Sequence, residues 1–157
     1  MTKEQITLER TFDATLREVW ELWTTKEGIE SWWGPDGFRV EVHAIDLRPG
    51  GLLLYAMIAD SPETIAFMKR EGMPTSTEAR ITYRDIVPWQ RLAYTHLADF
   101  IPGVAAYDVE TAVTLEQVGS KVMMTLRFDR MHDAMWTQRA TAGWTMELDK
   151  LAKRLTR

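Results

Sequence analysis

Three histidines and four tyrosines are the side chains of this sequence best suited to move a proton or hold a polar ligand. His43, His96 and His132 lie on different predicted elements, and none has a partner at the spacing of a metal site, which needs three or four ligands. His96 shares a strand face with Tyr94 and could bind a ligand or transfer a proton near neutral pH. An ordinary histidine at the end of a sheet is the alternative. We predict no metal site and no cofactor.

Motifs for nucleophilic or phosphate chemistry are not found. The chain has no cysteine, which excludes disulfides, thiolate metal sites and a cysteine nucleophile. The glycine-bearing turns at residues 34–37 and 50–51 lack the strand–loop–helix spacing of a phosphate loop. Asp108 and Glu110 share a strand face and could act as an acid–base pair. The alternation of that strand predicts that they point to solvent.

Large apolar side chains are a second group that could form a binding site, and the chain has seven tryptophans and nine methionines. Aromatic rings and thioethers form broad, adaptable apolar walls, and tyrosine and tryptophan add a polar atom that can hydrogen-bond a ligand. Core packing is the alternative for any single one of them. We predict that a ligand-binding pocket uses Trp32, Trp33, Phe38, Tyr55, Met57, Tyr83, Tyr94, His96, Met124, Trp136 and Trp144.

Hydrophobic periodicity predicts the elements that carry these residues. Residues 6–12 alternate as a strand does, and residues 15–18 (TLRE) fit a capping box that starts a short helix. Thr25 is placed to cap a second short helix that continues through residues 30–33. Six alternating segments follow, at residues 38–47, 52–59, 80–87, 91–97, 107–116 and 122–128, with a change of phase near residue 45 that suggests a bulge.

The last segment changes to a helical period. Trp144, Leu148, Leu151 and Leu155 form one stripe at i, i+4, i+7 and i+11, which predicts a helix over residues 132–155 with Asp133 as its N-cap. Consecutive hairpins build an antiparallel sheet, and one of its faces must be covered. We therefore expect one α+β domain, residues 1–157, in which a curved antiparallel sheet of about seven strands wraps around the long C-terminal helix. Two short helices follow the first strand.

Residues 60–78 are the least regular part of the chain. They contain two prolines and a glycine, but residues 63–70 could form one or two helical turns. We interpret this segment as an insertion between two strands. A mobile lid over a pocket, an ordered surface loop and a dimer contact remain open as its role.

Composition and charge exclude several classes of protein. Hydrophobic residues make up 45% and charged residues 27% of the chain, as in ordinary globular proteins, so a disordered chain is not expected. The net charge of −4, without a dense basic stripe, argues against nucleic acid as a partner. No run approaches the ~20 apolar residues of a membrane span, and the N-terminus has no apolar signal core. We expect a cytoplasmic protein.

Five short segments, in this order, resemble the START-like (SRPBCC, helix-grip) superfamily, and within it the AHSA-type family. That family is named after the C-terminal domain of the activator of the heat-shock-protein-ninety ATPase. The segments are FDA (12–14), VWELW (19–23), WWGP (32–35), DLRPGG (46–51) and GWTMELDKL (143–151). The resemblance implies the helix-grip fold and a hydrophobic cavity between sheet and helix. Members of the superfamily include ligand binders, cyclase-like enzymes and co-chaperone domains of the stress response, so the fold alone does not determine the function.

Three functions therefore stay open. The first is the binding of a small hydrophobic or aromatic molecule between the curved sheet and the C-terminal helix, without a cofactor. The second is a cyclase- or hydrolase-like enzyme that uses the same cavity, with His96 and the tyrosines as its first candidates. The third is a co-chaperone-type interaction domain with a chaperone partner. A homodimer is also open, and would require an exposed apolar patch.

Overall fold

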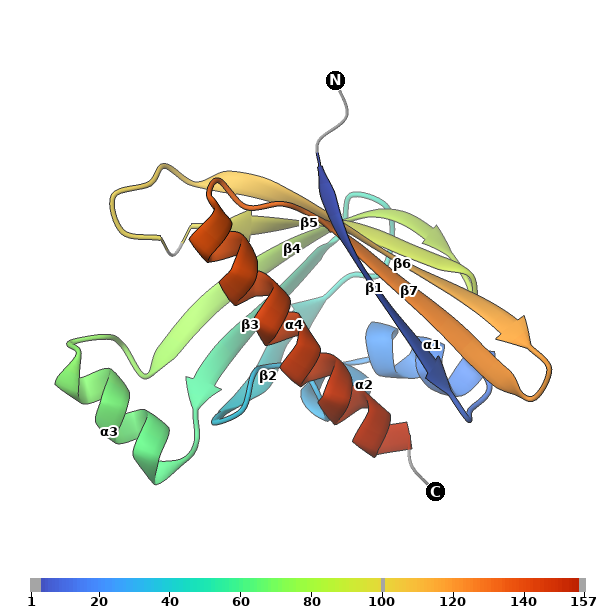
Figure 1. The fold of residues 1–157 in the computed structure, drawn as a ribbon, viewed down its shortest axis with the longest axis horizontal. Helices are drawn as coiled ribbons and strands as arrows, with labels where there is room; N and C mark the ends of the chain where they lie inside the picture. The colour runs from blue at the N-terminus through green and yellow to red at the C-terminus, as the bar shows by residue number, and fades with distance from the viewer. Residues whose placement is uncertain (1–3, 100, 156–157) are drawn as a thin grey trace.

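A seven-stranded antiparallel sheet and one long helix dominate the fold (Figure 1). The computed structural model describes residues 4–99 and 101–155. The strands follow the order β1-β7-β6-β5-β4-β3-β2 across the sheet, and the long helix crosses one of its faces. This arrangement confirms the predicted α+β helix-grip fold. The elements in chain order are β1 (Gln5–Phe12), α1 (Leu16–Thr24), α2 (Lys26–Glu30), β2 (Phe38–Ile45), β3 (Leu52–Ala59), α3 (Pro62–Arg70), β4 (Ser76–Val87), β5 (Arg91–Ala98), β6 (Tyr107–Val118), β7 (Lys121–Asp129) and α4 (Ala134–Leu155).

Consecutive strands from β2 to β7 pair with one another in antiparallel fashion, as their alternation predicts. The register of β2 against β3 shifts between Val42 and Ala44, close to the predicted change of phase. Strand β4 begins at Ser76, four residues earlier than expected, because Ser76 pairs with Ile58 at the end of β3. The polar start of β4 has no apolar alternation that would reveal a strand. The N-terminal strand β1 pairs with β7, which makes it one edge of the sheet.

Side-chain caps determine where the helices begin. Thr15 caps α1 in a complete capping box with Glu18, as predicted, and Thr25 caps α2 by accepting from the Gly28 N–H. The carboxylate of Asp133 accepts from the Trp136 N–H at 2.8 Å at the start of α4. Helix α2 ends at Glu30, earlier than expected, so Trp32 lies in the turn that follows it.

The core lies between the sheet, α1, α2 and the second half of α4. Its largest fully buried side chains include Trp23, Trp32, Leu148 and Leu151. The rings of Trp23 and Trp32 meet edge to face at 4.7 Å, an arrangement that aromatic pairs favour. This close packing anchors the C-terminal half of α4 against the sheet.

Helix α3 occupies the predicted insertion and stands apart from the sheet (Figure 1). Ser61 caps it, but none of its residues is buried, and Phe67 is 45% exposed. Within the described part of the chain, no helix has the length and apolar character needed to cross a membrane.

Candidate functional site: an apolar cavity beneath the long helix

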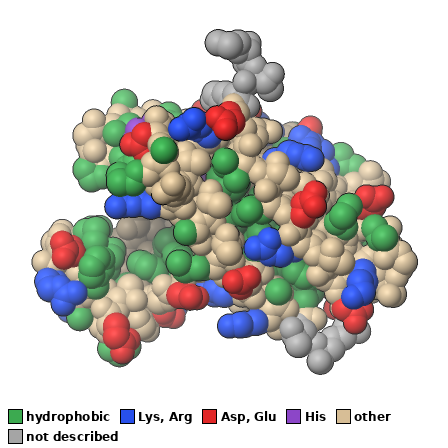
Figure 2. Space-filling view, in the orientation of Figure 1, with side chains coloured by type: hydrophobic (Ala, Val, Ile, Leu, Met, Phe, Trp, Pro, Cys, Tyr) green, Lys and Arg blue, Asp and Glu red, His purple; other side chains and the backbone are tan. Residues whose placement is uncertain are grey.

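A cavity of about 260 Å³ lies between α4 and the inner face of the sheet. It is partly open, and its walls are mainly apolar. Figure 2 shows a hollow, bordered by hydrophobic side chains, between the lobe formed by α3 and the start of α4. Interiors of folded proteins are normally close-packed, so a space of this size needs an explanation in the residues around it.

The N-terminal half of α4 forms one wall of this cavity. Trp136, Ala140, Gly143, Trp144 and Glu147 lie on one face of the helix, because steps of three or four residues lead from Trp136 to Ala140, from there to the adjacent pair Gly143 and Trp144, and on to Glu147. Two of the five are the smallest residue types, and a Cβ atom added to Gly143 would meet nothing within 4 Å. Small side chains in the middle of this face therefore leave the space open.

The sheet forms the opposite wall. His96 on β5 lies between Ile81 on β4 and Val109 on β6, which are its direct neighbours in the pairing of the strands. All three line the cavity, together with side chains on β3, β5, β6 and β7. Alternation places Tyr94 on the same face as His96, two residues earlier, and Tyr94 also lines the cavity. The wall thus combines aliphatic side chains with one histidine and two tyrosines, Tyr94 and Tyr55.

The turn that contains Gly34 borders the cavity, because its neighbours Trp33 and Pro35 are among the lining residues. The Gly34 N–H donates to Glu147 Oε1 at 2.8 Å, and the Gly34 carbonyl accepts from Lys150 Nζ at 2.7 Å. Gly34 has φ of +98°, a conformation that glycine adopts readily and other residues rarely. Two side chains one helical turn apart on α4 therefore bind the two peptide groups that flank Gly34, and these contacts tie the turn to the helix.

Burial has a large effect on the carboxyl group that accepts from Gly34. It raises the pKa of Glu147 to about 7, and the hydrogen bond from Gly34 and the charge of Lys150 only partly oppose this effect. Burial also raises the pKa values of Tyr55 and Tyr94, and the negative charge of Glu147 adds to both shifts. Both tyrosines therefore stay neutral at physiological pH, while Glu147 exchanges its proton close to pH 7.

His96 is affected in the opposite direction. Burial lowers the pKa of His96, while the nearby carboxylate of Asp99 partly raises it. The imidazole is therefore neutral near pH 7 and can both donate and accept a hydrogen bond.

Some polar atoms in the interior have no hydrogen-bond partner. Among the described residues, Trp33 Nε1 and the hydroxyls of Tyr83 and Tyr94 are enclosed without one. Thr111 is the cross-strand neighbour of Tyr94, but it makes no hydrogen bond of standard geometry with that hydroxyl. A buried unpaired polar group costs about 1–3 kcal/mol. Two of these residues, Trp33 and Tyr94, form part of the cavity wall.

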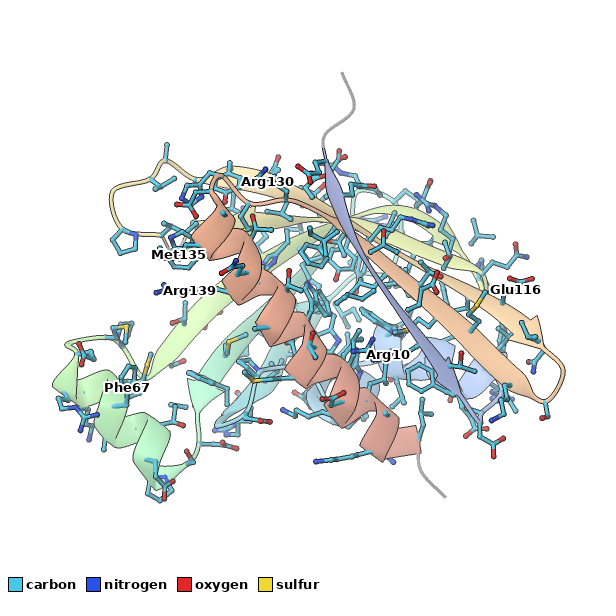
Figure 3. All side chains as sticks on the ribbon, viewed as in Figure 1. Arg10, Phe67, Glu116, Arg130, Met135 and Arg139 are labelled. Atoms are coloured by element: carbon cyan, nitrogen blue, oxygen red, sulfur yellow. The ribbon has the colours of Figure 1, made fainter. Side chains whose placement is uncertain are left out.

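Arg139 is the positively charged residue of the cavity wall. Its guanidinium carbon lies 4.9 Å from the centre of the Trp136 ring, a cation–π contact, and both residues contribute to the cavity wall. No acidic side chain within the described ranges forms an ion pair with Arg139. Figure 3 shows Arg139 on the early turns of α4, on the side of the hollow opposite Phe67 of α3.

The structure brings most of the predicted pocket residues together. Seven of the eleven line the cavity: Trp33, Tyr55, Met57, Tyr94, His96, Trp136 and Trp144. The other four, Trp32, Phe38, Tyr83 and Met124, do not. Trp32 donates to the Leu22 carbonyl inside the core, and Met124 accepts from Trp23 Nε1 there. Their apolar character is the same as that of the cavity residues, so the sequence alone could not separate the two groups.

Two charged residues of the cavity, Arg139 and Glu147, were not predicted. The signal that could have found them is the spacing of α4, because both lie on the face that carries Trp136, Ala140 and Gly143. The other two histidines lie elsewhere: His132 Nδ1 is 2.9 Å from the Tyr107 hydroxyl, and His43 is near two exposed glutamates. Within residues 4–99 and 101–155, no three His, Asp or Glu side chains are grouped as metal ligands.

Comparison with known proteins identifies the family. Residues 13–156 match the model of the family described as activator of Hsp90 ATPase homolog 1-like protein. The chain belongs to this family. The AHSA-type resemblance inferred from the five segments is therefore confirmed. No functionally curated protein matches the chain.

Several solved structures share the fold at low sequence identity. A protein of Chromobacterium violaceum is 22% identical, with a TM-score of 0.79 and coverage of 96% of both chains. The AHSA1 protein of Silicibacter pomeroyi is 19% identical, with a TM-score of 0.76 and coverage of 97% of both chains. CalU16 of Micromonospora echinospora is 20% identical, with a TM-score of 0.66, covering 97% of this chain and 76% of its own. These likenesses establish the fold.

Proposed function

We propose that this protein binds a small, largely apolar ring compound in the cavity beneath α4. The observation that carries the proposal is the hollow itself, kept open by Ala140 and Gly143 although the rest of the interior is well packed. An unfilled apolar space loses dispersion contacts and destabilises a protein, so its retention calls for a use. Binding is such a use.

The dimensions and chemistry of the cavity indicate the kind of ligand. A volume of about 260 Å³ equals that of about eight or nine water molecules in the liquid, which suits one or two fused rings with a few substituents. Trp33, Trp144 and Phe128 present aromatic surfaces to this space. Ring faces and edges pack well against such surfaces, and the few polar groups can orient a substituent.

Naphthalene is a suitable probe because it consists of two fused rings without a polar group. Titration of the protein should shift amide NMR signals of residues on both walls of the cavity, near Gly143 and Val109. The matched control is Gly143→Leu, whose side chain extends into the open space, so that the variant should fold and lose the naphthalene-dependent shifts. Equal shifts in both proteins, or none in the wild type, would contradict the proposal.

A second candidate is acid–base catalysis in the same cavity. It is favoured by one observation, the buried carboxyl of Glu147 with a pKa of about 7 beside two neutral tyrosines. A carboxylate at this position could remove a proton next to a carbonyl group, while a tyrosine hydroxyl donates to the oxygen that becomes negative. Enolisable 2-tetralone tests this function: the protein should accelerate its deuterium exchange in D₂O, and Glu147→Gln should abolish the acceleration. Exchange at the rate of buffer alone would exclude it for this ketone.

A chaperone interaction, which the description of the family suggests, remains a further alternative. It would use a surface of the protein and not the cavity. The Gly143→Leu variant separates the two functions, because filling the cavity should leave any chaperone captured by the wild-type protein still bound. Failure of both proteins to capture a chaperone would remove this alternative.

A further inference from the structure

The charges of the cavity wall are arranged along its length. Arg139 and Glu147 are the charged residues among those lining the space, and both lie on the same face of α4. They are eight residues apart, which corresponds to about 12 Å along a helix. An exposed positive group and a less exposed acidic group therefore stand at separate points along the cavity.

The positive group offers a prepared partner for an anion. Arg139 is exposed and has no ion pair with a described acidic residue, while its position over the Trp136 ring restricts the guanidinium. A restricted guanidinium loses less freedom when it binds a carboxylate, and its planar fork can donate two parallel hydrogen bonds. The surroundings of Glu147 oppose an anion, because its carboxyl already resists ionisation there.

We propose that the ligand is a small aromatic carboxylic acid, whose ring lies among the cavity tryptophans and whose carboxylate pairs with Arg139. This inference rests on the proposed binding function and names the class of ligand. Two features select that class together: an apolar space sized for one or two rings, and one exposed cation at its wall that has no ion pair within the described ranges. The acidic Glu147 determines the orientation of the ligand, with its charge toward Arg139.

Two probes of the same shape test the charge directly. 2-Naphthoate carries the carboxylate, and 2-naphthamide replaces it with a neutral amide. In calorimetric titrations at low salt, 2-naphthoate should bind about two- to fivefold more tightly than 2-naphthamide, the range expected for an ion pair at an exposed site. The difference should shrink as the salt concentration rises.

Variants locate the source of that preference. Arg139→Gln should bring the ratio of the 2-naphthoate and 2-naphthamide affinities close to one, while Arg139→Lys should retain part of the preference for 2-naphthoate. Lys121→Gln is the matched control, because it removes one positive charge at the exposed start of β7, away from the cavity residues. A preference that survives Arg139→Gln, or that falls equally in the Lys121→Gln variant, would overturn the assignment.

The probes also separate the two proposals. If both bind wild-type protein with equal affinity, the cavity is a binding site but the ligand is not selected as an acid. If neither binds and naphthalene produces no NMR shifts, both proposals fail.

Discussion

The two halves of α4 face the same sheet, but the second half packs closely against its neighbours and the first half leaves a cavity. In the second half, Leu148, Leu151 and Leu155 are buried and belong to the hydrophobic core. In the first half, Ala140 and Gly143 occupy the corresponding face and leave a cavity. The helix is continuous, so side-chain size, and not a break in the backbone, separates a filled region from a hollow one.

The polar groups follow the same division. Glu147 lies at the boundary, where it binds the Gly34 N–H and lines the cavity. Beyond it toward the C-terminus, the buried face of α4 is aliphatic. This difference shows that one helix can both stabilise the fold and shape a site, because its two functions use different turns.

Removing a leucine from the filled half should have the largest effect. Leu151→Ala leaves a cavity where a fully buried side chain was, so the free energy of unfolding should fall by about 2–5 kcal/mol. Urea denaturation measures this change. Met146→Ala, on the exposed face of the same helix, is the control and should change the free energy by less than about 0.5 kcal/mol. Equal effects for the two variants would show that the second half of α4 is not the anchor.

Glu147, at the boundary between the two halves of α4, should make the free energy of unfolding depend on pH. The pKa of Glu147 is about 7 in the folded protein and near 4.5 in the unfolded chain, so the folded protein binds the proton of this carboxyl group more tightly. Its cost to stability is absent below about pH 4.5, grows as the pH rises and is complete above pH 7. Glu147→Gln keeps an acceptor for Gly34 but cannot ionise, so it should be more stable than the wild type at pH 8 by about 1–3 kcal/mol.

The comparison between the two proteins isolates Glu147 from other groups. Lys150, Tyr55 and Tyr94 interact with it and are present in both proteins. His96 acts in the opposite direction, because its lowered pKa makes the fold less stable as the pH falls, but it too is common to both. Denaturation curves from pH 4.5 to 8 should therefore diverge only as the pH rises. Parallel curves would refute the assignment.

Removing an unpaired hydroxyl from the filled region should stabilise the protein. Tyr83 is 1% exposed and its hydroxyl has no hydrogen-bond partner among the described residues. Tyr83→Phe should raise the free energy of unfolding by about 1 kcal/mol, measured by urea denaturation. Tyr107→Phe is the contrasting variant, because that hydroxyl contacts His132 and its loss should lower stability. A loss of stability in the Tyr83 variant would mean that the hydroxyl has a partner.

The smallest change in the free energy of unfolding is expected for a substitution in the first half of α4, which borders the cavity. Gly143→Ala adds a methyl group where there is open space, and alanine favours a helix more than glycine does. The thermal midpoint should rise, with a gain of about 0.5–1 kcal/mol in the free energy of unfolding. A decrease would indicate that the wall near Gly143 is closed.

Local patterns explain why the elements were predictable. Thr15, Thr25 and Asp133 act as caps through atoms only a few residues away, and the alternation of a strand is visible in its own residues. The predictions failed where a distant partner decided the outcome. Ser76 is in a strand because Ile58 pairs with it, and no feature of its own neighbourhood shows this.

The candidate site was predictable only in kind. Aromatic residues on the inner face were expected to form a pocket, and seven of the eleven chosen line the cavity. The choice between cavity and core for Trp33 and Trp32 depends on where each ring points after the turn has docked on α4. Glu147 was missed because a glutamate on a helix usually faces solvent.

The amino-acid sequence alone determined the order of strands and helices, their caps and the family, because these depend on short-range patterns and on motifs read along the chain. The cavity, the identity of its lining residues and the raised pKa of Glu147 depend on the assembled fold. Strand register and the rotation of α4 about its axis bring together groups that are more than a hundred residues apart, such as Gly34 and Glu147. Burial, and with it the chemistry of a charged group, exists only once those distant parts have packed.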